Sequence, residues 1–324
     1  MEIQKKEMIH DMFIDITKEY LSKGENINNL KKIAIPIKKL KTKKKKSSYL
    51  KSIKWKLILI CFLSSITLSI IIQNDLIGKL IYDTRCYLPN NYLIWEFSRP
   101  NSNCNFCRNV KEPIILPTNI TRNDFLKYAY SSKPIVVKNG AKTWKASSVF
   151  SIEFFKNLYD SIDGAYESIE EDCQFLNFKT NFTSLKQVFY MSHERAMNID
   201  GKDSWYVGWK NCHPGVLSVI NQYYETPSFL PLDAEVPQTN YIFMGYEEGA
   251  SMHLDYIPRL MWQGQVLGRK TWEVAPTPEC DNVCERFTFN VDTGDVVLLD
   301  TRVWYHATIV RDKNLSLTIT SEYG

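Results

Sequence analysis

Apolar and polar residues follow each other in short runs through the last third of the chain. From Asn240 onward, short apolar segments alternate with turns, which is the pattern of strands in an all-β barrel or sandwich. The clearest run is Val296–Leu299, which follows the turn residues Gly294 and Asp295 and precedes Asp300. The pattern therefore predicts a mainly β fold for this part of the chain.

The residues before Asn240 carry signals for helices that flank this β region. Helices are predicted within residues 121–128, 151–159 and 184–191, because each stretch has a capping residue or apolar positions at helical spacing. Residues 134–138 form an apolar run typical of a buried strand. Residues 222–231 are rich in aromatic residues and bounded by proline, and we expect them to line the mouth of a site.

Residues 57–72 contain no charged side chain, with Lys56 before them and Asp75 after. An apolar run of about this length is near the lower limit for a membrane span. A buried core helix would show a polar face, and a cleaved signal peptide would start closer to the N-terminus. We therefore predict an uncleaved signal-anchor at residues 56–74, preceded by a basic cytosolic tail (residues 1–55) in which residues 3–21 form a helix.

Charge is distributed unevenly along the 324 residues, whose formal net charge is +4. Residues 1–56 hold 16 Lys and 6 acidic residues, while the remainder holds 24 basic and 30 acidic residues. A nucleic-acid-binding domain would carry the positive charge on its folded part, so no nucleic-acid partner is expected. The lysine-rich run 38–46 could serve as a nuclear localisation signal or a membrane-surface patch. The apolar run that follows favours a topology signal, which puts the N-terminus in the cytosol and the rest in the secretory lumen or outside the cell.

Cysteines and glycosylation sequons agree with this type II topology. Cys61 lies in the predicted span, and the other seven cysteines follow it: Cys86, Cys104, Cys107, Cys173, Cys212, Cys280 and Cys284. An oxidising compartment favours disulfides. We expect a local bond between Cys280 and Cys284, and a bond for Cys104 and Cys107 either with each other or with Cys86. The sequons at Asn119 and Asn181 suit a lumenal domain, whereas Asn314 adjoins a predicted core strand and is expected to be used less.

Metal chemistry is indicated by His253-Leu254-Asp255 and by His306. In a strand, residues two apart share a face, so His253 and Asp255 point the same way. Two imidazoles and one carboxylate form a facial triad that leaves coordination positions open, the arrangement of non-heme Fe(II) oxygenases. Lys270 stands in an otherwise apolar strand pattern. A buried lysine is costly unless an anion pairs with it, and a dicarboxylate co-substrate would supply that anion.

These residues resemble the JmjC/cupin-like family of Fe(II)- and 2-oxoglutarate-dependent oxygenases. The resemblance covers roughly residues 112–324 and rests on these pieces in order: KPIVVKNG (133–140), Trp144, the HxD at 253–255, GRKTWEVAP (268–276), Gly294-Asp295, WYH (304–306) and LTIT (317–320). It implies a double-stranded β-helix domain at residues 112–324, with residues 75–111 as a cysteine-containing stem.

By the same resemblance, His253, Asp255 and His306 hold iron, and Lys270 with Tyr206 binds the far carboxylate of 2-oxoglutarate. Thr318 or Thr320 provides a further co-substrate contact, and strand parity does not choose between them. The implied cofactors are Fe(II), 2-oxoglutarate and O2, with ascorbate as an optional addition. The chain departs from the family at Ala250, where relatives often carry Ser or Thr, and in the proline-free loop 300–302.

The resemblance implies an oxygenase, and the lumenal topology favours a hydroxylase of secretory-pathway proteins. A JmjC-type demethylase, a non-catalytic cupin-like binding protein and a metal cupin of different chemistry are the alternatives. The sequence does not indicate the oligomeric state. Two further histidines, His193 and His213, are expected at the surface or in loops, and residues 246–248 are expected to form a solvated loop before the first ligand.

Overall fold

The computed structural model describes residues 2–24, 26, 56, 58–67, 69, 92–178, 180–199, 201–246 and 249–324. The chain divides into two compact units, residues 1–99 and 100–324. In the first unit, α1 (Glu2–Ser22) confirms the predicted N-terminal helix, and α5 (Tyr92–Ser98) precedes the second unit. Among the described residues, no helix is both long and apolar enough to cross a bilayer. Much of the predicted span at 56–74 lies outside the described residues.

Two sheets form the framework of the second unit, in which all pairings except β1–β2 are antiparallel. The larger sheet has the order β1-β2-β9-β6-β11-β5-β4-β3, and its strands are β1 (Ile114–Leu116), β2 (Ile135–Val137), β3 (Phe175–Leu176), β4 (Tyr206–Asn211), β5 (Asn240–Gly245), β6 (Leu260–Leu267), β9 (Val296–Leu299) and β11 (Ser316–Tyr323). The smaller sheet has the order β10-β7-β8, and its strands are β7 (Lys270–Pro276), β8 (Phe287–Val291) and β10 (Trp304–Val310). The predicted β core with flanking helices is confirmed at this level.

The chain passes back and forth between the two sheets. After β5 it reaches His253, which pairs with His306 of β10, and then returns to the larger sheet as β6. Strands β7 and β8 belong to the smaller sheet, β9 to the larger, β10 to the smaller and β11 to the larger. The two sheets face each other, because Lys270 of β7 contacts Thr318 of β11. Side chains on these facing surfaces therefore share one interior.

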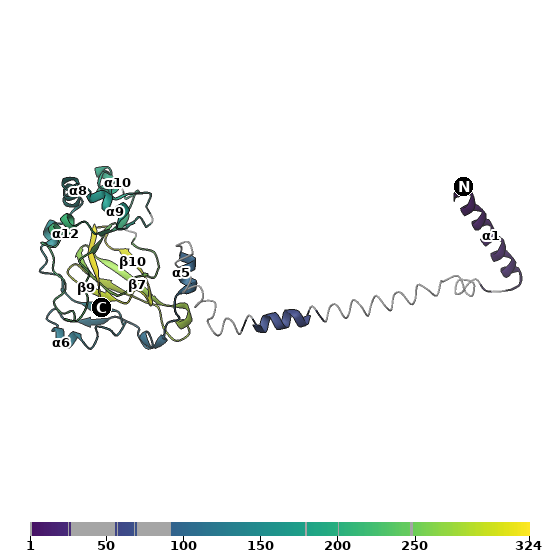
Figure 1. Ribbon diagram of the computed structural model, residues 1–324, viewed down its shortest axis with the longest axis horizontal. Helices are drawn as coiled ribbons and strands as arrows, with labels where there is room; N and C mark the ends of the chain where they lie inside the picture. Colours follow the sequence, from purple (N-terminus) through teal and green to yellow (C-terminus); the bar gives the residue numbers. More distant parts are fainter. Residues whose placement is uncertain are drawn as a thin grey trace. The chain divides into compact units, whose positions relative to one another are not determined.

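Short helices cover the larger sheet on its other face. They are α6 (Arg122–Phe125), α7 (Ala146–Val149), α8 (Ile152–Ser161), α9 (Ala165–Glu171), α10 (Leu185–Phe189), α11 (His193–Ala196) and α12 (Pro214–Ile220). Helices α8, α9, α10 and α12 gather at one end of the unit, and α6 lies at the opposite end (Figure 1). The hydroxyls of Thr121, Ser151 and Ser184 accept N-cap hydrogen bonds at α6, α8 and α10, which overlap the three helical ranges predicted from the sequence.

Aromatic side chains dominate the core between these helices and the larger sheet. The predicted aromatic segment 222–231 contributes to it: Tyr224 packs against Trp144 and Trp262, and Phe229 packs against Phe125. The expectation that this segment lines the mouth of a site is therefore wrong, because burial of its rings in the core stabilises the fold more than exposure at a rim would.

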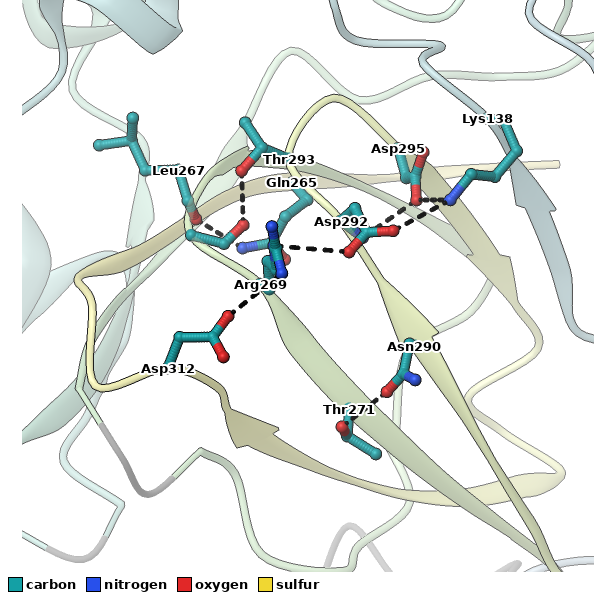
Figure 2. Close-up of polar contacts among 11 residues, drawn as sticks. Lys138, Gln265, Leu267, Arg269, Thr271, Asn290, Asp292, Thr293, Asp295 and Asp312 are labelled. Carbon is teal, nitrogen blue, oxygen red and sulfur yellow. Dashed lines mark hydrogen bonds and ion pairs between the residues drawn. The ribbon is translucent and has the colours of Figure 1, made fainter.

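The buried carboxylate of Asp295 connects the end of β2 to the turn before β9. Asp295 is almost fully buried and accepts hydrogen bonds from Lys138 Nζ (2.5 Å) and from the backbone N–H groups of Asn139 and Asp292 (3.0 Å each). Figure 2 shows the Lys138 ammonium group in contact with the carboxylates of both Asp292 and Asp295. The turn before β9 is thereby fixed to the end of β2, which explains the aspartate in the Gly294-Asp295 motif.

Disulfides pair cysteines that are far apart in the sequence. Cys104 bonds to Cys280 and Cys107 to Cys284, so the short helix η2 (Cys104–Phe106) is tied to η3 (Pro278–Cys280) and the loop after it. A third bond joins Cys173 and Cys212. The predicted local bond between Cys280 and Cys284 is wrong, and so is the predicted bond of Cys104 and Cys107 with each other or with Cys86. The 104–107 segment lies against this loop, and each of its cysteines pairs with one cysteine of the loop.

Candidate metal centre and co-substrate cradle

The segment around His253 runs beside β10 and aligns the candidate ligands. The backbones of His253 and His306 exchange two hydrogen bonds, and Thr308 N donates to Ala250 O (3.0 Å). On the other side of the pair, Asp255 N donates to Thr301 O (2.9 Å). The extended conformation predicted from the HxD spacing is confirmed, so His253 and Asp255 lie on one face and His306 lies beside them.

The three side chains converge on one point. One ligand atom from each of His253, Asp255 and His306 lies within 4.8 Å of the other two. Nε2 of His253 is 3.3 Å from Asp255 Oδ1, and Nε2 of His306 is 3.8 Å from Asp255 Oδ2. These residues form a His-Asp-His group that can hold a metal ion, and the two imidazole rings have their centres 4.3 Å apart.

Backbone carbonyls orient both imidazoles for ligation. Nδ1 of His253 lies 2.6 Å from Ser251 O, and Nδ1 of His306 lies 3.2 Å from Trp304 O. A carbonyl only accepts hydrogen bonds, so each Nδ1 carries a proton and Nε2 is the ring nitrogen left for a metal. This is the tautomer that a metal requires.

Burial and neighbouring charges set the protonation states of the triad. Burial, with the charge of His253, lowers the pKa of His306 to about 4, so this imidazole is neutral. Burial raises the pKa of Asp255, but hydrogen bonding to His253 and the charge of His306 outweigh it, and the net pKa is lowered. For His253, burial lowers the pKa, but the hydrogen bond to Asp255 leaves the net pKa raised. An ionised carboxylate and one neutral imidazole are therefore ready for a cation.

Lys270 is the charged group buried deepest in the interior. It is 0% exposed, and its Nζ contacts the hydroxyls of Tyr206 (2.5 Å) and Thr318 (3.4 Å). Both partners are neutral, and among the residues that the structure describes no carboxylate pairs with this ammonium group. Burial lowers the pKa of Lys270 to about 7 and raises that of Tyr206. The burial of Lys270 that its apolar strand pattern predicts is confirmed.

The structure distinguishes the two threonines of β11. Thr318 faces Lys270, whereas the hydroxyl of Thr320 donates to the carbonyl of Trp262 on the adjacent strand. The hydroxyl of Thr320 is thereby engaged within the larger sheet. Thr318 is the one of the two that belongs to the cradle formed by Lys270 and Tyr206.

Thr308 is a polar residue of the site that the sequence did not indicate. It stands two positions after His306 on the same face of β10, and its Oγ1 accepts from Ala250 N (3.1 Å). Its hydroxyl also bonds to Tyr206 and partly opposes the rise in the pKa of that phenol caused by burial. A Cβ on Gly249 would collide with the Thr308 backbone and hydroxyl. Ala250 lacks the hydroxyl that the family resemblance leads one to expect at that position. The hydroxyl of Thr308 lies beside it instead.

The proline-free loop before His306 is held by a buried ion pair. The carboxylate of Asp300, 3% exposed, accepts from Arg302 Nε (2.8 Å) and from Ser132 Oγ (2.6 Å). Thr301 in the same loop accepts the N–H of Asp255. Side-chain contacts at Asp300 therefore hold this loop, and a main-chain hydrogen bond connects it to the candidate ligand Asp255.

The other histidines of the second unit lie elsewhere. His193 begins α11 at the surface, and His213 is the N-cap of α12, where its Nδ1 accepts from Gly215 N. Both predictions are confirmed. Tyr246 is buried beside Trp205, which corrects the expectation of a solvated loop at that residue, while residues 247 and 248 lie outside the described part of the chain.

No protein-family model matches the sequence, and no curated protein matches it. Solved structures do resemble the fold at low identity. One is YcfD, a ribosomal oxygenase from Escherichia coli, at 14% identity and a TM-score of 0.41 over 66% of this chain and 53% of that one. Another is the same protein with cobalt and succinic acid, at 12% identity and a TM-score of 0.40 over 64% and 52%. This chain thus spans about half the length of those structures, and a likeness this coarse assigns no role to any residue.

Proposed function

We propose that this protein is an Fe(II)- and 2-oxoglutarate-dependent oxygenase that hydroxylates proteins of the secretory pathway. One observation carries the proposal: the His253–Asp255–His306 group and the anion-lacking Lys270 face the same interior. A metal site alone would suit many chemistries. A metal site together with a buried ammonium group suits a co-substrate that chelates the metal at one end and carries a carboxylate at the other.

The topology supports this proposal. The chain alternates between two facing sheets through β5, the His253 segment, β6, β7, β8, β9, β10 and β11, as a double-stranded β-helix would require. In this fold the ligands come from the smaller sheet and its edge, and the facing strands supply the remaining walls. Fold alone does not define activity, so the proposed function rests on the polar groups in the interior.

The residues present fit the implied groups. His253 and His306 would ligate iron through Nε2, and Asp255 would ligate through its carboxylate, the donor set preferred by non-heme Fe(II). Lys270 would pair with the far carboxylate of 2-oxoglutarate, while the hydroxyls of Tyr206 and Thr318 donate hydrogen bonds to it. Charge-assisted hydrogen bonds of this kind are the stronger ones in protein interiors.

When bound, Fe(II), 2-oxoglutarate and O2 supply the oxidation, in which 2-oxoglutarate becomes succinate and CO2 and one oxygen atom enters a substrate C–H bond. The chain's own residues bind, orient and exclude water. Trp272, stacked on the His306 ring with centres 5.8 Å apart, covers one face of that imidazole. Thr308 holds the Tyr206 phenol, and the Ser251 and Trp304 carbonyls hold the ligand tautomers.

A lumenal location and a protein substrate are part of the proposal. The three disulfides support an oxidising compartment. Asn119 and Asn181 are exposed, as glycosylation requires, whereas the sequon of Asn314 has its Ser316 fully buried. Expression in a secretory cell line followed by glycosidase treatment tests this location. Loss of mass dependent on Asn119 or Asn181 supports it, and an unglycosylated chain that cytosolic protease can reach contradicts it.

Anaerobic spectroscopy tests the cofactor assignment. The full-length chain is mixed with Fe(II) and 2-oxoglutarate, and we expect a visible charge-transfer band from the chelated complex. His306→Ala should abolish the band, and Lys270→Ala should weaken 2-oxoglutarate binding while iron binding persists. His213→Ala is the matched control and should leave the band unchanged. A folded chain without the band would instead favour a non-catalytic binding protein or a cupin of different chemistry.

A further inference from the structure

Two acceptor side chains lie on the interior surface beyond the Lys270 cradle. Glu322 is four residues after Thr318 on β11, so both point into the interior between the sheets. The strand register pairs Thr320 with Gln263 and Glu322 with Met261. Gln263 is therefore the diagonal neighbour of Glu322 on the same face.

Both side chains are buried, and each has an oxygen without a hydrogen-bond partner. Glu322 is 8% exposed and Gln263 is 5% exposed. In the part of the chain that the structure describes, Glu322 Oε2 and Gln263 Oε1 accept no hydrogen bond. A buried acceptor that has lost water costs free energy, so native proteins seldom leave one unpaired. Two such oxygens on the same face of the sheet point to a missing donor.

The charges around Glu322 connect this pair to the candidate metal centre. Burial raises the pKa of Glu322, the charges of Lys210 and Arg259 oppose that rise, and the charge of Asp255 adds to it. The carboxylate of Glu322 is therefore within electrostatic reach of a proposed metal ligand.

The neighbouring cations do not satisfy the two oxygens. Arg259 Nη1 is 3.9 Å from Glu322 Oε2, which is beyond hydrogen-bond distance, and its Nη2 pairs with Glu235 at 2.5 Å. Lys210 Nζ lies 5.5 Å from the centre of the Tyr241 ring. These contacts balance much of the charge, but they leave the acceptor positions open.

We propose that Glu322 and Gln263 form the subsite for the substrate's side chain and that this side chain offers two N–H donors, as a guanidinium or a primary amide does. The proposal rests on the proposed oxygenase function for the identity of the reacting site. A carboxylate has only acceptors and would face the like charge of Glu322, and a hydrocarbon would leave both oxygens unpaired. A site built for hydrogen bonds rejects analogues that lack them.

Four blocked peptides test the donor requirement. N-acetyl-Gly-Gly-X-Gly-Gly N-methylamides with X as arginine, glutamine, glutamate or methionine are titrated into the full-length chain with Mn(II) and 2-oxoglutarate. Broadening of the peptide NMR lines by Mn(II) reports binding near the metal and requires no turnover. The arginine or glutamine peptide should bind at least tenfold more tightly than the glutamate and methionine peptides. Equal affinities, or tighter binding of the latter two, overturn the proposal.

Variants then identify the donor group. Gln263→Met should weaken the preferred peptide at least tenfold. Glu322→Gln should weaken an arginine peptide at least tenfold, because it removes the negative charge, but a glutamine peptide less than threefold. Glu235→Gln is the control, because this exposed residue shares Arg259 but does not face the interior, and it should leave all four affinities unchanged. Preserved selectivity in Gln263→Met and in Glu322→Met, with both variants folded by thermal unfolding, overturns the assignment.

Failure of this subsite can be told apart from failure of the proposed function. Mn(II) and 2-oxoglutarate binding is measured first, without peptide. If neither binds, the oxygenase assignment fails, and the peptides are compared on the metal-free chain by saturation-transfer NMR. Selectivity for N–H donors that depends on Glu322 and Gln263 then still supports the subsite, and its absence there overturns it.

Discussion

The backbones of His253 and His306 are joined by a reciprocal pair of hydrogen bonds, His253 N to His306 O at 3.1 Å and His306 N to His253 O at 2.9 Å. The two candidate ligands thus form one hydrogen-bonded pair between adjacent extended segments. Their spacing is fixed by main-chain pairing and does not depend on a metal. The site is preorganised, so binding a cation requires little rearrangement.

Metal affinity should depend on pH through a single proton. The pKa of His306 is lowered to about 4 and that of Asp255 is also lowered, so both are already in their ligating forms near neutral pH. The pKa of His253 is raised, so this imidazole must lose a proton to bind metal. Affinity for Co(II) should fall about tenfold per pH unit below the pKa of His253. Absorbance titrations between about pH 5 and 8 measure this slope, and a slope of zero or of two protons would contradict it.

Replacing Lys270 by methionine should stabilise the free protein while weakening 2-oxoglutarate binding. The folded-state pKa of about 7 lies below that of an unfolded lysine, so burial penalises the charged form. The penalty is fully present below pH 7 and disappears as pH rises toward about 10. At pH 7 and below, Lys270→Met should raise the free energy of unfolding by on the order of 4 kcal/mol.

The pH dependence distinguishes this cause from improved packing. Between about pH 7 and 10, the stability of the wild type should rise relative to Lys270→Met, because the unfolded lysine binds the additional proton. Denaturant unfolding at several pH values measures the difference. A difference that stays constant with pH would show that packing and not charge is responsible. Lys210→Met, at a partly exposed position, serves as the comparison.

The two threonines of β11 should differ in their effect on co-substrate binding. Thr318→Val removes a hydroxyl beside Lys270 and should weaken 2-oxoglutarate binding by about tenfold, equivalent to about 1.4 kcal/mol. Thr320→Val removes a hydroxyl bonded to the Trp262 carbonyl and should change 2-oxoglutarate affinity less than twofold. Calorimetric titration of both variants with 2-oxoglutarate and Mn(II) compares them. A larger effect from Thr320→Val would reverse the assignment.

Asp295→Asn should destabilise the fold by about 3 kcal/mol. The amide cannot accept all the hydrogen bonds that Lys138, Asn139 and Asp292 donate to the buried carboxylate. The matched control is Asp292→Asn, whose carboxylate is half exposed and lies 3.4 Å from Lys138 (Figure 2). That change should cost less than about 1 kcal/mol. Equal midpoints in chemical unfolding would refute the role of burial.

The disulfides Cys104–Cys280 and Cys107–Cys284 should contribute to stability in a non-additive way. Each closes a long loop, with sequence separations of 176 and 177. Once one bond has formed, the other closes only a short additional loop. Replacing one cysteine pair by alanine should therefore cost about 1 kcal/mol, and replacing both should cost about 4 kcal/mol or more. Unfolding of the three variants without reductant tests this, and equal, additive losses would contradict it.

Local sequence signals predicted those parts of the structure that depend on neighbouring residues. The caps Thr121, Ser151 and Ser184 mark real helices because an N-cap bond spans three residues. The spacing of His253 and Asp255 fixes their common face for the same reason. Lys270 was predicted from its place in an apolar strand pattern, and the family motifs added the context for His306.

Partners that meet only through tertiary pairing left no signal in the sequence. The hydroxyl of Thr308 reaches the Ala250 backbone across two adjacent extended segments, and Cys280 finds Cys104 rather than its neighbour Cys284. The choice between Thr318 and Thr320 likewise depends on which carbonyl lies near each hydroxyl. Strand register sets these distances, and it becomes known only when the sheets are assembled.

The position of β11 within the larger sheet has a consequence for the order of folding. Of the described strands it comes latest in the chain, yet it lies between β6 and β5 and carries Thr318 and Glu322. During synthesis, β5 and β6 must wait unpaired on these edges until residues 316–323 emerge. The nascent chain therefore exposes two sheet edges until β11 has been synthesised, and we expect its yield to depend on chaperones that shield such edges.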